Sequence, residues 1–120
     1  MQKKAKGDLG EKLAVEYLKR NKFKIIGNNF YSQFGEIDII AFDKKTDETV
    51  FLEVKSRATN NFGYPEEAVN KAKLVKMYKT AQVYFDKYKL MHKYRFDCLA
   101  IELDFHERKA RLRHYRGIVC

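Results

Sequence analysis

Two apolar runs decide the fold of this chain: Glu36-Ile37-Asp38-Ile39-Ile40-Ala41-Phe42 and Val50-Phe51-Leu52-Glu53-Val54-Lys55-Ser56-Arg57. The first run is apolar at almost every position, which is typical of a strand covered on both faces. The second run alternates, so Glu53 and Lys55 share one face. The polar residues 43–49 predict a hairpin centred near Thr46, which places Asp38 opposite the stretch from Glu53 to Lys55. Asp38 joins their face only if the register has the right parity, which the sequence leaves open.

Further elements follow on both sides of this hairpin. Residues 3–20 predict an amphipathic helix that ends at Asn21, with a buried stripe of Ala5, Leu9, Leu13, Tyr17 and Leu18. Residues 23–31 predict a strand that closes at the turn 32–35. Residues 95–103 predict another buried strand, and residues 108–119 a weaker, basic strand at the edge of the sheet.

A second helix is expected to begin at Pro65 after the polar loop 58–64, with Glu66 and Glu67 in its first turn. Its predicted apolar stripe consists of Leu74, Tyr78, Ala81 and Phe85, flanked by Met77, Tyr84 and Tyr88. The lysines of this helix, Lys73, Lys76, Lys79 and Lys87, gather on the opposite side. Such a face is more often solvated surface than a dedicated phosphate-binding face.

The order α-β-β-β-α-β-β predicts an α/β fold with a central mixed sheet flanked by helices. A length of 120 residues with 45% hydrophobic content suits one domain, residues 1–120. The net charge of +9 favours nucleic acid as a partner, although excess lysine also keeps small domains soluble.

Cys98 and Cys120 form no disulfide framework or metal motif, and no apolar stretch is long enough for export or for a membrane span. We therefore expect a cytoplasmic protein.

The chemistry is expected at Asp38, Glu53 and Lys55. A carboxylate among isoleucines is costly to bury without a cation. Lys55 could be that cation in a structural salt bridge, but Glu53 would then add unwanted negative charge. Two acids and a lysine suit Mg²⁺ or Mn²⁺, which takes oxygen ligands and shares them with substrate phosphate. Glu11 is a fourth candidate at the margin of the first helix's buried stripe, although its spacing alone favours a capping box with Asp8 as N-cap.

These residues also resemble a known family. The split pattern of Asp38 followed by Glu53-Val54-Lys55 is similar to the signature of restriction-endonuclease-like nucleases. More specifically, the chain resembles the bacterial YraN-like family from about Lys6 to Leu103. The segments that carry this likeness are Gly7-Asp8-Leu9-Gly10-Glu11, Gly35-Glu36-Ile37-Asp38-Ile39-Ile40-Ala41, Glu53-Val54-Lys55-Ser56-Arg57 and Arg95-Phe96-Asp97.

The resemblance implies a restriction-endonuclease-like fold, similarity to archaeal Holliday junction resolvases, and nuclease activity. By the resolvase pattern it implies that Asp38 and Glu53 bind metal, that Lys55 assists the attacking water or the phosphate, and that Glu11 supports the metal through water. The segment after Ala110, including His114-Tyr115-Arg116-Gly117, matches no motif and is assigned no chemistry.

Three functions remain open. The first is a metal-dependent endonuclease acting on structured or branched DNA, for which symmetric cutting of two strands would favour a homodimer. The second is a non-catalytic nucleic-acid-binding module of the same fold, and the third is a basic scaffold. Buried acids that would face a phosphate backbone favour the enzyme, because a module that only binds gains nothing from their repulsion. Phe62 and Tyr64 in the loop before the second helix are expected to pack locally rather than to stack on bases.

Overall fold

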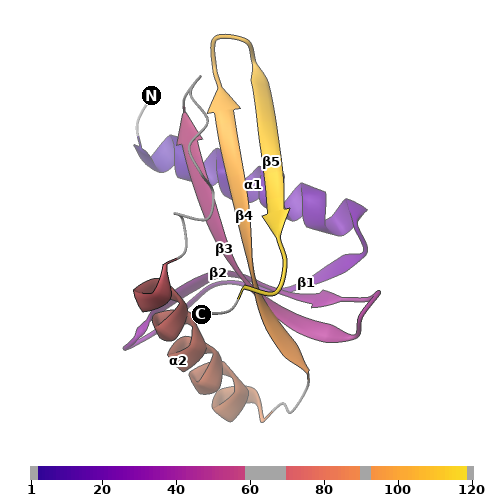
Figure 1. Ribbon diagram of the computed structural model, residues 1–120, viewed down its shortest axis with the longest axis vertical. Coiled ribbons are helices and arrows are strands. Elements are labelled where there is room, and N and C mark those ends of the chain that lie inside the picture. Colours follow the sequence, from indigo (N-terminus) through magenta and orange to yellow (C-terminus); the bar gives the residue numbers. More distant parts are fainter. Residues whose placement is uncertain (1–2, 59–69, 90–92, 119–120) are drawn as a thin grey trace.

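The structure, a computed structural model, describes residues 3–58, 70–89 and 93–118. Its elements are α1 (Lys3–Arg20), β1 (Phe23–Ser32), β2 (Gly35–Asp43), β3 (Glu48–Ala58), α2 (Lys71–Tyr88), β4 (Tyr94–Asp104) and β5 (Lys109–Tyr115). The predicted order α-β-β-β-α-β-β is confirmed (Figure 1). Phe62 and Tyr64 lie outside the described residues. In the described part of the chain, no helix is long and apolar enough to cross a membrane.

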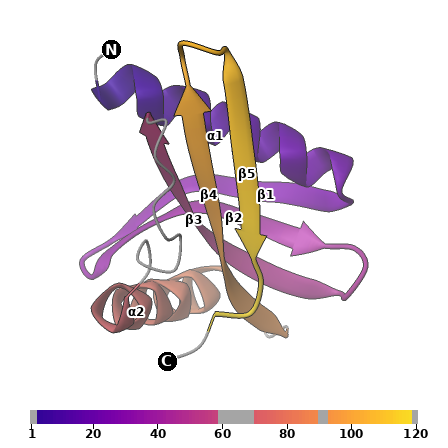
Figure 2. The same cartoon turned by 45° about the horizontal axis from the view of Figure 1, so that its top comes forward.

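The sheet is mixed, as predicted, and its strand order is β1-β2-β3-β4-β5. β3 and β4 pair in parallel, and the other neighbours pair antiparallel. A parallel pair needs a crossover connection, and α2 lies within it. The two helices lie on opposite faces of the sheet (Figures 1 and 2). β5 is an edge strand, as its weak pattern predicted.

α1 covers one face with a stripe of the predicted period, and among residues 8–20, whose side chains the structure describes, the most deeply buried are Gly10, Ala14 and Leu18. Ala5 of the predicted stripe lies outside these residues. Gly10 lies so close to β3 that a Cβ added there would overlap the Ser56 hydroxyl and lie 2.8 Å from the Ser56 Cβ. The absence of a side chain at Gly10 therefore lets α1 approach the half of β3 that carries Glu53. α1 is already helical at Asp8, so the expected capping box with Asp8 as N-cap is wrong.

α2 covers the other face and begins at Lys71. Its N-cap is Asn70, whose side-chain oxygen accepts a hydrogen bond from the Lys73 backbone N–H at 2.8 Å. The predicted start at Pro65 lies outside the described residues, and the first turn of α2 contains no acidic residue, unlike the expected one.

The buried side of α2 consists of Leu74, Met77, Thr80, Ala81 and Tyr84. Tyr78 was predicted in this stripe and is instead 49% exposed. Adjacent helical positions differ by about 100°, so the full burial of Met77 turns its neighbour Tyr78 away from the sheet. Phe51 of β3 contacts the Tyr84 ring edge to face at a centroid distance of 5.7 Å, which joins α2 to the centre of the sheet.

A buried ionic network joins the β2–β3 turn to β4. The Arg95 guanidinium donates to Asp43 at 2.8 Å, to Glu48 at 2.7 Å and to Asp97 at 3.0 Å. Burial alone would raise the pKa of Asp97, but hydrogen bonds from His114 and Arg95 and from the Gly117 backbone lower it. The Arg95-Phe96-Asp97 motif is thus part of a satisfied structural cluster.

The same network gives the C-terminal segment a structural role that the sequence did not predict. His114 Nε2 lies 2.7 Å from Asp97 Oδ2, and His114 Nδ1 lies 2.9 Å from the Tyr17 hydroxyl. Its side chain therefore connects β5 both to β4 and to α1.

Candidate functional site

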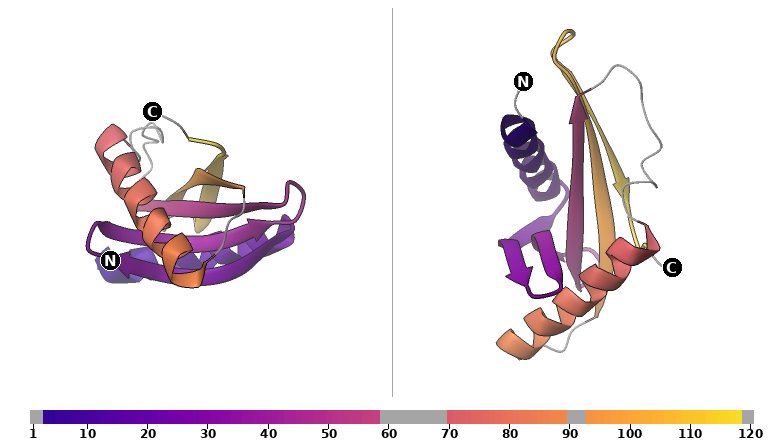
Figure 3. Two further views of the ribbon diagram at one scale, coloured as in Figure 1. Left: turned by 90° about the horizontal axis from the view of Figure 1, so that it is seen from below. Right: turned by 90° about the vertical axis from the view of Figure 1, so that its left-hand side faces the viewer.

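The candidate site lies where β2 and β3 part. Their paired register ends at Ile39 and Leu52, and beyond it the β1–β2 hairpin turns away from β3 (Figure 3, right). The Asp38 carboxylate occupies this branch point: its Oδ2 accepts a hydrogen bond from the Val54 backbone N–H at 2.7 Å. A backbone donor that has lost its strand partner is thereby satisfied by an acidic side chain.

The parity that the sequence left open brings Asp38 and Glu53 together. Ile40 and Phe51 are register partners, and both belong to the core beneath α2. Side chains repeat every two residues along a strand, so Asp38 and Glu53, each two positions further on, lie side by side on that face. Glu53 is almost completely buried, with 4% exposure.

Two lysines contact the Glu53 carboxylate. Lys73 Nζ of α2 lies 3.4 Å from Glu53 Oε1, and Lys55 Nζ of β3 lies 3.8 Å from the same oxygen. The second oxygen, Oε2, is buried and has no hydrogen-bond partner. An unpaired buried carboxylate oxygen is costly, so this atom is open to a cation or to a proton shared with Asp38, whose pKa a side-chain hydrogen bond with Glu53 lowers.

Lys73 is the residue that sequence reasoning placed wrongly, on a solvated lysine face. Its side chain is one-third exposed and packs against Glu53. The signal was its spacing, because Lys73 precedes the buried Met77 and Thr80 by four and seven positions and so lies on the buried side of α2. Lys55, which was expected to contact Asp38 in the salt-bridge alternative, is close to Glu53 instead.

The pKa values of the two acids reflect their burial. Desolvation, followed by the negative charge of Asp38, raises the pKa of Glu53 to about 7, with Lys73 and Lys55 opposing the rise. Desolvation also raises the pKa of Asp38, against the hydrogen bond from Val54. Near neutral pH, the Glu53 carboxyl is therefore partly protonated. A divalent cation bound by Asp38 and Glu53 would displace this proton.

Glu11 of α1 lies near enough to Asp38 for their charges to interact. Burial raises the pKa of Glu11, and the charges of Asp38 and Glu36 raise it further. The four predicted site residues, Glu11, Asp38, Glu53 and Lys55, thus gather around the branch point of β2 and β3. Glu36 is an acid of this cluster that sequence reasoning did not single out, although its position two residues before Asp38 on the same strand was the available signal.

The donor set of this cluster suits a hard divalent cation. Carboxylate oxygens are the ligands of Mg²⁺ and Mn²⁺, and no soft sulfur ligand is needed. Among residues 3–58, 70–89 and 93–118, no group of three or more His, Cys, Asp or Glu side chains is arranged to hold a metal ion. Asp38 and Glu53 fit a Mg²⁺ site in which water and substrate phosphate complete the coordination, because Mg²⁺ commonly uses only one or two carboxylates.

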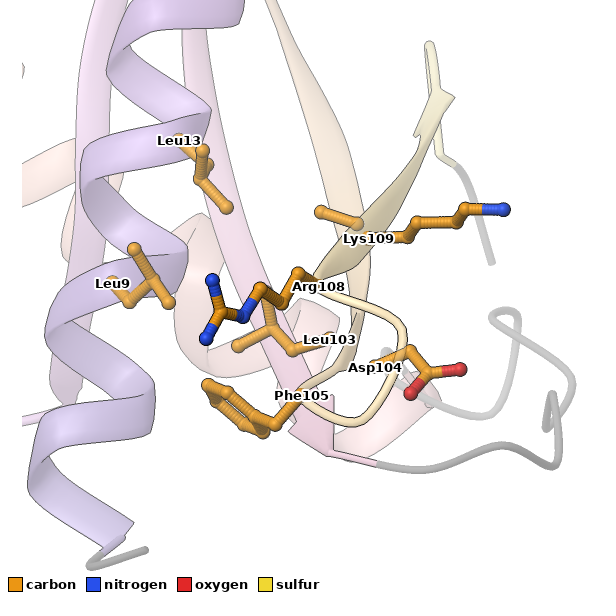
Figure 4. A pocket seen from close by; sticks show the side chains of 8 residues that line it. Leu9, Leu13, Leu103, Asp104, Phe105, Arg108 and Lys109 are labelled. Atoms are coloured by element: carbon orange, nitrogen blue, oxygen red, sulfur yellow. The ribbon is translucent and has the colours of Figure 1, made fainter.

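A pocket of about 380 Å³ lies elsewhere, between α1 and the β4–β5 turn. Figure 4 shows the Arg108 guanidinium reaching between Leu9 and Leu103, while the Asp104 carboxylate and the Lys109 amine point away. None of the predicted site residues lines it. Its apolar walls suit the packing of α1 on the sheet rather than phosphate chemistry.

The fold and the site define an α/β protein with a buried carboxylate pair flanked by two lysines. The chain belongs to the family described as Uncharacterised protein family UPF0102, whose match covers residues 10–101. The resemblance to the YraN family is therefore confirmed.

Relatives with the same designation span most of the chain. A UPF0102 protein of Clostridium tetani is 50% identical over 96 residues, which are 79% of this chain and 77% of the relative. One from Persephonella marina is 46% identical over 97 residues, with 80% and 82% covered, and one from Fusobacterium nucleatum is 44% identical over 103 residues, with 82% and 85% covered.

Proposed function

We propose that this protein is a metal-dependent endonuclease of restriction-endonuclease-like fold that hydrolyses phosphodiester bonds in structured or branched DNA. The observation that carries the proposal is the pairing of Asp38 with the buried Glu53, whose Oε2 has no partner, beside two lysines. A structural salt bridge with the two lysines accounts for one oxygen of Glu53 but brings no cation to the other. A metal ion held by Asp38 and Glu53 accounts for both acids.

The proposed roles follow from the position of each side chain. Asp38 and Glu53 would hold Mg²⁺ or Mn²⁺, which when bound supplies Lewis-acid chemistry to the phosphate and the attacking water. Lys55 is 51% exposed at its side chain, so its amine can reach solvent and offset charge that develops on the phosphate. Glu11, half-buried with a raised pKa, would hold a water at the margin of the carboxylates.

The second candidate is a nucleic-acid-binding module of the same fold that does not cut. The net charge of +9 favours this candidate and the enzyme alike, because both must attract phosphates. The buried carboxylates favour the enzyme, since they would only repel a phosphate backbone in a module without metal.

The deciding experiment is a cleavage assay on a labelled four-way junction, a flap, single-stranded DNA and plain duplex, each with Mg²⁺, Mn²⁺ or EDTA. Asp38→Asn should abolish cleavage and keep or improve DNA binding, because it removes a metal ligand and one repelling charge. Asp47→Asn is the matched control: Asp47 is exposed in the β2–β3 turn at φ 58°, a conformation that asparagine tolerates. Full cleavage by Asp38→Asn would refute the assigned site, and salt-sensitive binding without cleavage by the wild type would favour the binding module.

A further inference from the structure

Four lysines line one edge of α2 and lead away from the candidate site. Lys73, Lys76, Lys79 and Lys87, here called the lysine row, fall on one broad side of the helix at 100° per residue. At 1.5 Å per residue the row extends about 9 Å from Lys73 to Lys79 and about 21 Å to Lys87. α2 carries a single acidic residue, Asp86, so this helix is strongly basic.

The row begins at the proposed metal ligands, because Lys73 Nζ contacts Glu53 at 3.4 Å. From there it runs beside the β1–β2 hairpin, which lies alongside α2 (Figure 2). The Lys76 Cβ is 3.8 Å from the position that a Cβ would take at Gly35. The hairpin is held to the helix by a hydrogen bond of 2.9 Å between the hydroxyls of Ser32 and Thr80.

The outer lysines lie over aromatic rings of the hairpin. Lys79 Nζ is 5.6 Å from the centroid of Phe34, which is 37% exposed, and Lys87 Nζ is 6.0 Å from the centroid of Phe30. Ring faces attract ammonium groups and restrict the long lysine side chains. These contacts favour positions of the Lys79 and Lys87 ammonium groups beside the hairpin.

We propose that the lysine row binds the phosphate backbone of one nucleic-acid strand and leads that strand to Asp38 and Glu53. A strand of duplex carries a phosphate about every 3.4 Å of axial rise, so the row corresponds to about six nucleotides. The contacts are to phosphate and carry no base readout. The inference rests on the proposed function in that it takes nucleic acid as the substrate, but it assigns a binding surface that does not depend on cleavage.

The test measures binding in EDTA, without chemistry. The row variant combines Lys76→Gln, Lys79→Gln and Lys87→Gln and leaves Lys73 unchanged. The matched control combines Lys12→Gln, Lys19→Gln and Lys24→Gln at exposed positions of α1 and β1, with the same loss of charge. A fluorescently labelled 30-base-pair duplex is titrated over a KCl series and followed by anisotropy, and circular dichroism checks that both variants are folded.

The row variant should lose at least tenfold in affinity near 100 mM KCl, and its slope of log K against log[salt] should fall by about 3 in magnitude. The control should lose less than threefold and keep a slope within about 1 of the wild type. An equal loss in both variants would overturn the proposal, because it would show a response to net charge alone. Wild-type affinity and slope in the row variant would also overturn it.

The two proposals fail separately. If the wild type binds through the row but cuts nothing with Mg²⁺ or Mn²⁺, the nuclease proposal is refuted and the row is supported. If the wild type cuts and the row variant binds and cuts as well as the wild type, the nuclease proposal stands and the row is refuted.

Discussion

Replacing Glu53 by glutamine tests the electrostatic account of the site through protein stability. In the metal-free protein, burial and Asp38 raise the pKa of Glu53 from 4.5 to about 7. At about 1.4 kcal/mol for each tenfold change in proton affinity, ionising Glu53 in the folded state costs about 3 kcal/mol. Glutamine has a similar shape and does not ionise, so the variant avoids this cost.

The sign of the effect follows from proton binding. Between pH 4.5 and 7 the folded state holds a proton on Glu53 that the unfolded state has lost. The contribution of Glu53 to the free energy of unfolding therefore falls as the pH rises. Above pH 7 the full cost is present. The stability difference between Glu53→Gln and wild type should therefore change in favour of the variant by about 2 to 3 kcal/mol from pH 5 to pH 8.5.

Urea unfolding in EDTA at several pH values measures this difference. Glu16→Gln is the control, since Glu16 is exposed on α1 and its curve should run parallel to that of the wild type. Parallel curves for Glu53→Gln and wild type between pH 5 and 8.5 would refute the reasoning.

In a separate measurement without EDTA, Mg²⁺ should stabilise the wild type at pH 8 by about 1.4 kcal/mol at a concentration ten times its dissociation constant, and should stabilise Glu53→Gln less.

Three further outcomes are expected. Gly10→Ala should lower the free energy of unfolding by about 1 to 3 kcal/mol, as measured in urea, because the added Cβ overlaps the Ser56 side chain. Adding Ser56→Gly to this variant should restore part of the loss, because the Ser56 Cα is 4.0 Å from the added Cβ. Asp97→Asn should cost about 3 kcal/mol or more, since it removes a buried carboxylate partner of the Arg95 guanidinium. Asp47→Asn should change stability by less than about 0.5 kcal/mol, and equal values for the two variants would contradict the structural role of the network. Lys55→Ala should lower the cleavage rate more than the affinity for DNA, because one cation among 25 Lys and Arg adds little to overall attraction. Paired kinetic and binding measurements check this, and a loss confined to affinity would count against a catalytic role of Lys55.

The helices and strands were readable from the sequence because their patterns are local. The period of α1, the alternation of β3 and the polar turn before it predicted the element order that the structure confirms. The start predicted at Pro65 lies outside the described residues, and it is the extended backbone of Asn70 that makes this residue the N-cap of α2 as described. Tyr78 was misplaced because a tyrosine suits either side of an amphipathic helix.

The identity of the acids in the candidate site was also predictable, since a carboxylate within an apolar strand stands out in any sequence. The proximity of Asp38 and Glu53 was not predictable. Whether Asp38 faces Glu53 or points to the opposite side depends on a register of one residue, which local patterns do not determine. Lys73 was missed because it reaches Glu53 from an element 20 positions later in the chain.

By itself, the sequence determined the elements, the charge and the residue types available for chemistry, because these depend on neighbours within a few positions. Tertiary structure alone decided the parting of β2 and β3, the unpaired oxygen of Glu53 and the course of the lysine row beside the hairpin. Each of these results from packing two helices against one twisted sheet, which brings together side chains that no local rule connects.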